Sequence, residues 1–468
     1  MTAANVVDYF LGFGATVIMP VIIMVVGLVV GLSFGRALRS GLLIGVGLTG
    51  MLLVITGLFY AQIAPAATAM VQRSGIKLDM VDVAWGPMAL ITWAWPFAPL
   101  MWPIQIAINL VMLALGWTKT MNVDMWCVFV KAFVAALIGR VTGNIWLGFA
   151  LASVEVVLEL KMGDWIAHAT HEYTGVPGIT VPHLAALGCM LAAPINAILD
   201  RIPGLNKFKT DPQMLRDKLG MFGEPMIIGL IMGIALGVLA GFSFQKIVQL
   251  AIAAAAALVL MPMMARLFME SLAPLSEAAT DFMRARFPGR EIFIGLDWPV
   301  LAGNPATYAI GILAIPLMIG WMMIMPGNRT MIFGAIADWA WIISPIAVML
   351  GGDIIRTLIV SAVILIPTYL WASTVVGPVI TGLGQQVGIA MPKDAMMITW
   401  FGIPPLQAAL LKIANLNVES IVYVAVIIAL FLFAWRYMPT LDRRAKERLA
   451  SAAEPEATPA LEVGLQAQ

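Results

Sequence analysis

Long apolar segments recur along the chain and are separated by short clusters of Gly, Pro and charged residues. A helix needs about 20 mostly apolar residues to cross the hydrocarbon core of a bilayer, and the chain offers about a dozen such segments. Hydrophobic residues make up 61% of the 468 positions and charged residues 11%. A soluble domain has roughly one quarter charged residues and could not cover so much apolar surface. The pattern predicts an all-α integral membrane protein.

Landmarks of the first half recur in the second half. The run Gly-Ile-Thr-Val-Pro-His at 178–183 is answered by Gly-Ile-Ala-Met-Pro-Lys at 388–393, and Thr-Met at 120–121 by Thr-Met at 330–331. Both pairs are about 210 residues apart, and a collinear series of this kind indicates an internal duplication. We expect two structural repeats, at 1–206 and 223–417.

Each repeat is expected to hold five spanning helices and a short final segment. The expected helices are 7–32, 40–62, 97–116, 123–141 and 145–161, then 224–242, 248–265, 307–325, 331–350 and 355–376. The final segments, 178–200 and 388–412, are interrupted by prolines. They suit re-entrant hairpins, because non-helical backbone at membrane depth must be buried in protein or line a cavity.

Charge provides a test of this topology. Five spans per repeat give the halves opposite orientations, and a final helix at 419–435 makes about eleven spans. With the N-terminus outside and the C-terminus in the cytoplasm, most of the 27 Lys and Arg residues are cytoplasmic, as the positive-inside rule requires. The tail after Arg448 is rich in Ala, Glu and Pro and is expected to be disordered. A net charge of +1 gives no reason to expect a nucleic-acid partner.

Polar residues beside Gly/Pro turns and Trp rings are candidates for binding a polyol. Asp82 and Trp85 follow the second helix, and Asp297 and Asn304 occupy the corresponding stretch of the second half. Hydroxyl groups need hydrogen-bond donors and acceptors, and C–H faces pack on aromatic rings. The alternative is that Asp82 and Asp297 only cap short helices.

The three histidines suggest two further possibilities. His168, His171 and the adjacent Glu172 have a spacing that a metal site could use, although such a polar loop beside a membrane is also an ordinary place for histidine. His183 follows a proline at the start of an interrupted segment, where it could bind a solute hydroxyl. We expect no metal and no cofactor.

Four other polar positions have two interpretations each. Asn144 and Asp353 lie in matched Gly-Asn and Gly-Asp turns, where they contact solute or only form tight turns. Glu155 and Lys131 lie within expected spans, where charge suggests function or a mutual ion pair. The two cysteines, Cys127 and Cys189, are interpreted as small buried residues.

An ordered set of motifs resembles one family. The set comprises Phe-Gly-Ala-Thr at 13–16, Val-Asp-Val-Ala-Trp at 81–85, Gly-Asp-Trp at 163–165, Gly-Ile-Thr-Val-Pro-His at 178–183, Gly-Glu-Pro at 223–225, Gly-Leu-Asp at 295–297 and Gly-Asp at 352–353. Over about 8–437 the chain is similar to the galactitol-type membrane component (EIIC) of the bacterial phosphoenolpyruvate-dependent phosphotransferase system. Asn304 stands where this resemblance leads us to expect a histidine, and 385–412 diverges.

The resemblance implies a sugar-alcohol permease of the bacterial inner membrane. It implies a homodimer, with opening helices as a scaffold and a mobile core carrying the substrate, and separate EIIB and EIIA phosphocarrier proteins. The expected domains are scaffold 1–66, core 67–206, linker 207–222, scaffold 223–270, core 271–417, final helix 418–437 and a disordered tail 438–468. Two other functions remain open: an ion- or proton-coupled secondary transporter that uses a carboxylate such as Glu155, and a membrane metalloenzyme built on His168, His171 and Glu172.

Overall fold

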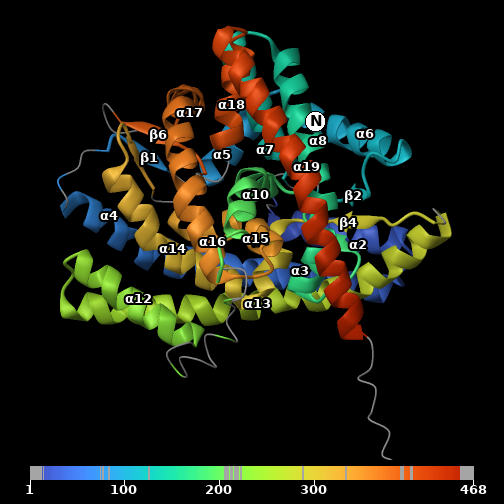
Figure 1. The fold of residues 1–468 in the computed structure, drawn as a ribbon, viewed down its shortest axis with the longest axis horizontal. Coiled ribbons are helices and arrows are strands. Elements are labelled where there is room, and N and C mark those ends of the chain that lie inside the picture. Colours follow the sequence, from blue (N-terminus) through green and yellow to red (C-terminus); the bar gives the residue numbers. More distant parts are fainter. Residues whose placement is uncertain are drawn as a thin grey trace, which may run out of the picture.

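The computed structural model describes residues 13, 15–73, 75, 78–82, 85–124, 127–204, 210, 214, 221, 224–286, 289–332, 335–389, 395–400 and 404–453. Helices dominate the molecule, and two small three-stranded sheets lie among them (Figure 1). The fold is therefore mostly helical. The sequence predicts an all-α fold, and it did not predict the two small sheets.

The first half contains α2 (Ala15–Val29), α3 (Phe34–Val54), η1 (Ile55–Ile63), α4 (Ala64–Arg73), β1 (Met80–Asp82), α5 (Trp85–Ala94), η2 (Ala98–Leu100), α6 (Met101–Ala114), β2 (Thr120–Asn122), α7 (Val128–Thr142), α8 (Ile145–Trp165), α9 (Ala167–Thr174), β3 (Ile179–Thr180), η3 (Leu184–Leu187) and α10 (Gly188–Leu199). The second half contains α12 (Pro225–Leu239), α13 (Phe244–Arg286), β4 (Phe293–Gly295), η5 (Trp298–Gly303), α14 (Pro305–Ile324), β5 (Thr330–Met331), α15 (Ala335–Met349), α16 (Ile354–Val360), η6 (Ser361–Leu365), α17 (Ile366–Gln386), β6 (Met396–Ile398), α18 (Pro404–Ala414) and α19 (Val418–Ala453).

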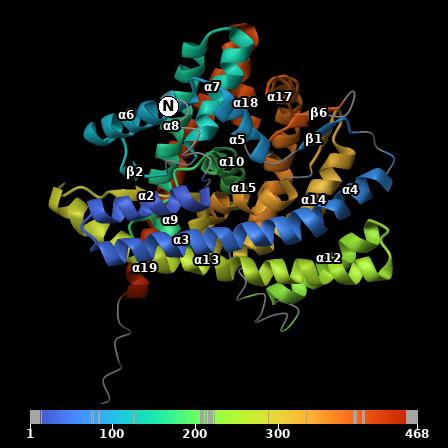
Figure 2. The ribbon, with the colours of Figure 1, turned by 180° about the vertical axis from the view of Figure 1, so that it is seen from behind.

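The opening helices of both halves form one layer. α2 packs on α3, α3 on α13 and α13 on α12, and Figure 2 shows α3, α13 and α12 running side by side along one side of the molecule. A Cβ on Gly233 of α12 would lie 2.5 Å from the Cα of Ala251 on α13. The two helices thus approach at a distance that only glycine allows.

Each sheet combines strands from both halves of the chain. β1 lies between β5 and β6, and β4 lies between β2 and β3, with every pair parallel. Because parallel strands run in one direction, their carboxyl ends meet at the same edge of a sheet. The chain segments that follow β2, β4 and β3 therefore converge.

Two opening helices are longer than expected. The chain is helical from Phe34 to Arg73 through α3, η1 and α4, and α13 continues to Arg286, past the expected end at 265. The expected boundary between 270 and 271 falls inside α13. Packing explains the extension: the Ser40 hydroxyl donates to the Ser271 carbonyl oxygen at 2.9 Å, and the Ser271 hydroxyl donates to the Ser40 carbonyl oxygen at 2.8 Å. These buried bonds join α13 to α3 beyond the expected helix end.

The first interrupted segment breaks only once. Pro182 lies between β3 and η3, but Pro194 lies inside α10, so the expected break at Pro194 is wrong. A proline within a helix removes one backbone hydrogen bond and need not end the helix when its surroundings hold it. In the second half, α18 begins at Pro404, and Pro392 lies outside the described residues.

The C-terminal helix continues into the expected tail. The expectation of disorder from 438 is wrong for residues 438–453, which are helical in α19. Ion pairs hold this part to the rest of the molecule: Arg448 binds Glu172 through two hydrogen bonds of 2.7 Å, and Lys446 Nζ lies 2.9 Å from Glu291 Oε1. The remainder, 454–468, lies outside the described residues.

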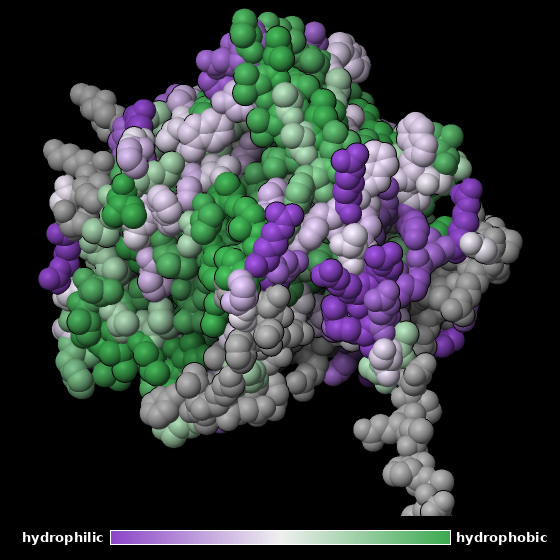
Figure 3. Space-filling view, in the orientation of Figure 1, coloured by the Kyte–Doolittle hydropathy of each residue, from purple (hydrophilic) through white to green (hydrophobic). Residues whose placement is uncertain are grey.

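Within the described part of the chain, three helices are long and apolar enough to cross a membrane: Pro305–Ile324, Ile354–Gln386 and Val418–Ala452. Shorter apolar helices lie in α2, α10, α12, α13 and other elements. Apolar side chains cover much of the visible face, while hydrophilic ones gather toward the lower right, near the lower end of α19 (Figure 3). These helices are typical of a membrane protein, and the number of spans stays a prediction.

Candidate functional site

One sheet edge brings three chemically active side chains together. Cys127 follows β2, Asp297 follows β4 and His183 follows β3. Asp297 Oδ1 lies 3.5 Å from Cys127 Sγ and 3.6 Å from His183 Nε2. We call these three residues the site cluster. The sequence predicted His183 and Asp297 as binding residues, and the structure places them side by side although they come from different halves of the chain.

His183 is oriented by its own backbone neighbourhood. It is fully buried and precedes η3, and its Nδ1 accepts a hydrogen bond from the Ala185 N–H at 3.2 Å. An accepting Nδ1 is unprotonated, so the neutral ring carries its proton on Nε2. No hydrogen-bond partner for Nε2 is found among the described residues. The Nε2–H group is thus a donor directed toward Asp297.

Asp297 has a structural contact and a remaining acceptor. Its Oδ1 accepts from the Trp298 N–H at 2.7 Å, and this bond caps η5. The capping alternative from the sequence is therefore realised. Across the described residues, the contacts to Trp298, Cys127 and His183 all use Oδ1. Oδ2 remains available to accept a hydroxyl proton, and the side chain is 12% exposed.

Three tryptophans adjoin the site cluster. Trp298 stacks on Trp341 at 4.0 Å between ring centroids. Trp400 lies edge-on to Trp341 at 6.4 Å and to the His183 ring at 6.1 Å. The Nε1 atoms of Trp341 and Trp400 are buried and find no partner within the described ranges. Because buried donors in native proteins nearly always have partners, these groups suit a ligand that carries hydroxyl oxygens.

Two of the other predicted residues belong to the second sheet and the helix that follows it. Asp82 is buried at the end of β1, opposite Ile398 of β6. Trp85 begins α5, and its side chain lies outside the described part. Both remain predictions as solute contacts.

The last three predicted residues cap helices. Asn144 is exposed and accepts from two backbone N–H groups of α8. Asn304 accepts from Ala306 N at 2.9 Å and donates to the Tyr173 carbonyl at 3.0 Å. Asp353 accepts from Arg356 N at 3.0 Å. These contacts agree with the tight-turn interpretation of Asn144 and Asp353.

Sequence reasoning missed Cys127, Trp341 and Trp400 as neighbours of the site. Cys127 is buried, as expected, but its contact with Asp297 depends on the pairing of β2 with β4 across the two halves. Strands of two or three residues leave almost no periodic signal in an apolar sequence. The Trp298 position, directly after Asp297, was the only local indication that aromatic rings gather here.

Neither histidine arrangement favours a metal. The three ligand atoms of the site cluster lie within 4.8 Å of one another, but a metal would need the Nε2 lone pair of His183, and the Ala185 contact puts the proton there. At the other position, His168 Nδ1 lies 2.6 Å from Asp442 and its Nε2 lies 3.1 Å from Glu291. Glu172, the third candidate ligand at that position, is paired with Arg448.

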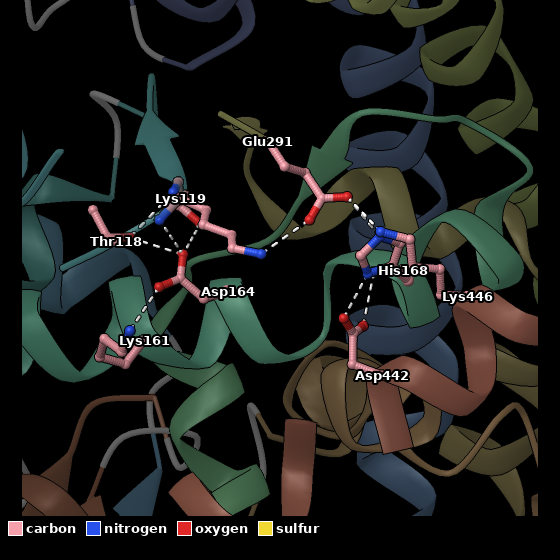
Figure 4. A network of polar contacts seen from close by, with 9 residues as sticks. Thr118, Lys119, Lys161, Asp164, His168, Glu291, Asp442 and Lys446 are labelled. Carbon is pink, nitrogen blue, oxygen red and sulfur yellow. Dashed lines mark hydrogen bonds and ion pairs between the residues drawn. The ribbon is translucent and has the colours of Figure 1, made fainter. Parts of the chain in front are cut away.

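A polar network lies at the opposite end of the same strands (Figure 4). Lys119, which directly precedes β2, pairs with Glu291, which precedes β4, at 2.9 Å. Glu291 also contacts His168 and Lys446. Partial burial raises the pKa of Glu291, but hydrogen bonds from Lys446 and Lys119 outweigh burial and bring it to about 2. Partial burial lowers the pKa of His168, but Asp442 and Glu291 outweigh it, so the net shift is upward.

A mostly helical, apolar chain that encloses a small polar cluster is typical of a membrane permease for a polar solute. Comparison with known proteins identifies the kind. The profile of the sugar-specific permease component of the phosphotransferase system, EIIC-GAT, matches residues 9–394, and the chain belongs to this family. It is 34% identical over 406 residues to the galactitol-specific EIIC components of Escherichia coli strains K12 and O157:H7, covering 85% of this chain and 90% of each relative.

Family membership makes this chain a membrane protein, which in bacteria lies in the inner membrane. A permease of this system takes a sugar-type substrate and works with an EIIB protein. The sequence-based prediction of the family and of the phosphotransferase permease function is confirmed.

Proposed function

We propose that the chain binds galactitol or a closely related sugar alcohol and translocates it for phosphorylation by EIIB. The relatives named as galactitol-specific support this substrate. The observation that carries the proposal is the chemistry around Asp297: one carboxylate acceptor beside buried donors on His183, Trp341 and Trp400. A linear polyol offers a hydroxyl on every carbon, so it can satisfy acceptor and donors together, and its C–H groups can pack on the indole rings.

Burial of the site supports a transport cycle in which access alternates. His183 is fully buried, so a solute reaches it only after the surrounding elements move. We propose that α2, α3, α12 and α13 form the scaffold and that the elements around the two sheets form the mobile core, with two inverted repeats. The strand order of the sheets supports two inverted repeats, because β1 and β4 each lie between two strands from the other half of the chain.

The assembly is proposed as a homodimer with its C-terminus in the cytoplasm. Exposed apolar side chains on the scaffold helices, such as Val21, Leu42 and Val46, are compatible with a subunit interface or with lipid. EIIB, phosphorylated in turn by EIIA, would dock on the basic segments 201–218 and 284–290, where Arg201 and Arg290 are exposed.

Transport by inside-out vesicles tests the proposed function. Galactitol phosphate should form only when phosphorylated EIIB is supplied, and Asp297→Asn should reduce its formation strongly. Glu419→Gln, an exposed change on α19, is the matched control and should behave as wild type. Accumulation of unmodified galactitol under an ion gradient would instead identify a secondary transporter. If another sugar were phosphorylated and galactitol were not, only the proposed substrate would be refuted.

A further inference from the structure

A buried ion-pair cluster lies next to the site cluster. Lys131 of α7 and Glu159 of α8 are each 1% exposed, and Lys131 Nζ lies 2.7 Å from Glu159 Oε2. Glu155 of α8 is fully buried and lies one helical turn before Glu159, on the same face. We call Lys131, Glu155 and Glu159 the buried triad. It contains two carboxyl groups and a single cation.

Among the described residues, Glu155 has no hydrogen-bond donor to stabilise it as a carboxylate. Neither of its two oxygens has a hydrogen-bond partner in the part of the chain that the structure describes. Glu155 lies four residues before Glu159 on α8, a spacing at which the two carboxyl groups can meet and share a hydrogen bond. Two ionised carboxylates cannot form that bond, because both are acceptors only. A single proton would supply the missing donor.

Close packing keeps the triad away from water. A Cβ on Gly148 of α8 would collide with the backbone of Ala135 on α7, so the two helices are in near-backbone contact. An uncompensated charge in such surroundings is strongly unfavourable and is ordinarily neutralised by a change of protonation.

Neighbouring groups add negative rather than positive charge. The acidic side chain of Asp124 adjoins the same turn: its Oδ1 accepts from the Cys127 N–H at 3.1 Å, and the Cys127 carbonyl oxygen lies 3.4 Å from Lys131 Nζ. Cations on the described elements that pack on α7 and α8 are engaged elsewhere or exposed. Lys412 of α18 pairs with Glu419, Lys161 of α8 pairs with Asp164, and His168 of α9 pairs with Asp442. Arg140 of α7 and the Lys and Arg residues of α19 are exposed.

We propose that the buried triad is a proton-binding site that holds one proton, shared between Glu155 and Glu159, at neutral pH. With that proton the triad is neutral: Lys131 is paired with a carboxylate, and the protonated carboxyl donates to the other one. The buried triad is connected to the site cluster through Cys127. Lys131 Nζ lies 3.4 Å from the Cys127 carbonyl oxygen, and Cys127 Sγ contacts Asp297.

Infrared spectroscopy of the purified full-length protein in lipid tests this site directly. The wild type should show the carbonyl band of a buried carboxylic acid at neutral pH. Glu155→Gln and Glu159→Gln should each remove it, because the remaining carboxyl is then ionised against Lys131. Lys131→Met should leave both carboxyl groups protonated, because no cation remains to stabilise a carboxylate, and the band should increase about twofold. Glu155→Gln mimics the protonated acid in shape, so it should fold even if the lysine variant does not.

Glu419→Gln is the control and should leave the band unchanged, since Glu419 is 63% exposed and paired with Lys412. An acid band that persists in both glutamine variants would assign the proton to another residue and overturn the proposal. Absence of the band in the wild type, the result expected if a bound metal cation neutralised the triad, would also overturn it. The measurement needs neither sugar nor EIIB, so its outcome is independent of the proposed transport function.

Discussion

At the residue scale, Asp297 has an observed structural role and a proposed binding role. Its Oδ1 caps η5 through Trp298 N, while Oδ2 is the acceptor that the proposal assigns to the polyol. Asparagine caps a helix about as well as aspartate does. A substitution can therefore separate the two roles.

Asp297→Asn should weaken galactitol binding to the purified protein about tenfold to a hundredfold, because a charge-assisted hydrogen bond contributes about 1.5 to 3 kcal/mol. Calorimetry or equilibrium dialysis measures the affinity, and size-exclusion chromatography checks that the protein remains folded. An affinity within threefold of wild type would leave Asp297 with the cap alone.

Trp400→Phe should move stability and affinity in opposite directions. The buried Nε1–H of Trp400 has no partner within the described residues, and an unsatisfied buried donor costs about 1 to 3 kcal/mol. Removing it should raise the melting temperature of the substrate-free protein and lower its affinity for galactitol. A loss of both would indicate that the ring only packs.

His183→Ala should abolish most uptake, whereas His171→Ala should leave it near the wild-type level. His183 is buried in the site cluster with its Nε2–H directed toward Asp297. His171 lies on α9 and is partly exposed. Vesicle uptake at matched expression measures both variants, and equal losses would contradict a special role for His183 in the site.

At the element scale, sheet pairing links the site to the C-terminal helix. β2, β4 and β3 run from the polar network at their amino ends to the site cluster at their carboxyl ends. α19 is held at the network end, where Asp442 accepts from the backbone N–H groups of His168 and Ala169.

Docking of the end of α19 should weaken as the pH rises. The folded-state pKa of His168 lies above its ordinary value, so its contribution is fully present below about 6.5 and is lost as pH rises through the raised pKa. Glu291, with a pKa near 2, loses its contribution only as pH falls toward that value. Limited trypsin digestion after Arg443 and Lys446 should accelerate at alkaline pH. His168→Gln should remove this pH dependence relative to wild type, and His171→Gln should retain it.

At the scale of the whole molecule, the proposed inverted repeats fix the side on which each loop lies. A cysteine at 212 and a tag at the C-terminus should both report the cytoplasm, and Phe244→Cys should be labelled from outside by an impermeant maleimide. Phe244 begins α13 and is 82% exposed. Labelling of position 244 only in permeabilised cells would refute the inverted arrangement.

The sequence by itself determined the class of protein. Apolar segments of spanning length require helices in a membrane, because backbone groups in lipid must be satisfied within the segment. The ordered motifs predicted the family, and local signals indicated His183 and Asp297, since a polar residue beside Gly or Pro breaks the apolar pattern wherever it occurs.

Only the tertiary structure decided which polar residues meet. His183 and Asp297 are joined by parallel pairing of β3 with β4, and Cys127 by pairing of β2 with β4. Such contacts join distant segments through backbone hydrogen bonds, which any sequence can make, so the residues carry no local trace of their partners. The same holds for Lys131: the sequence placed it beside Glu155, and helix packing paired it with Glu159. Tertiary contacts also decided where helices end: Ser271 binds α13 to α3, and Arg448 binds α19 to Glu172, beyond the ends that the sequence predicts.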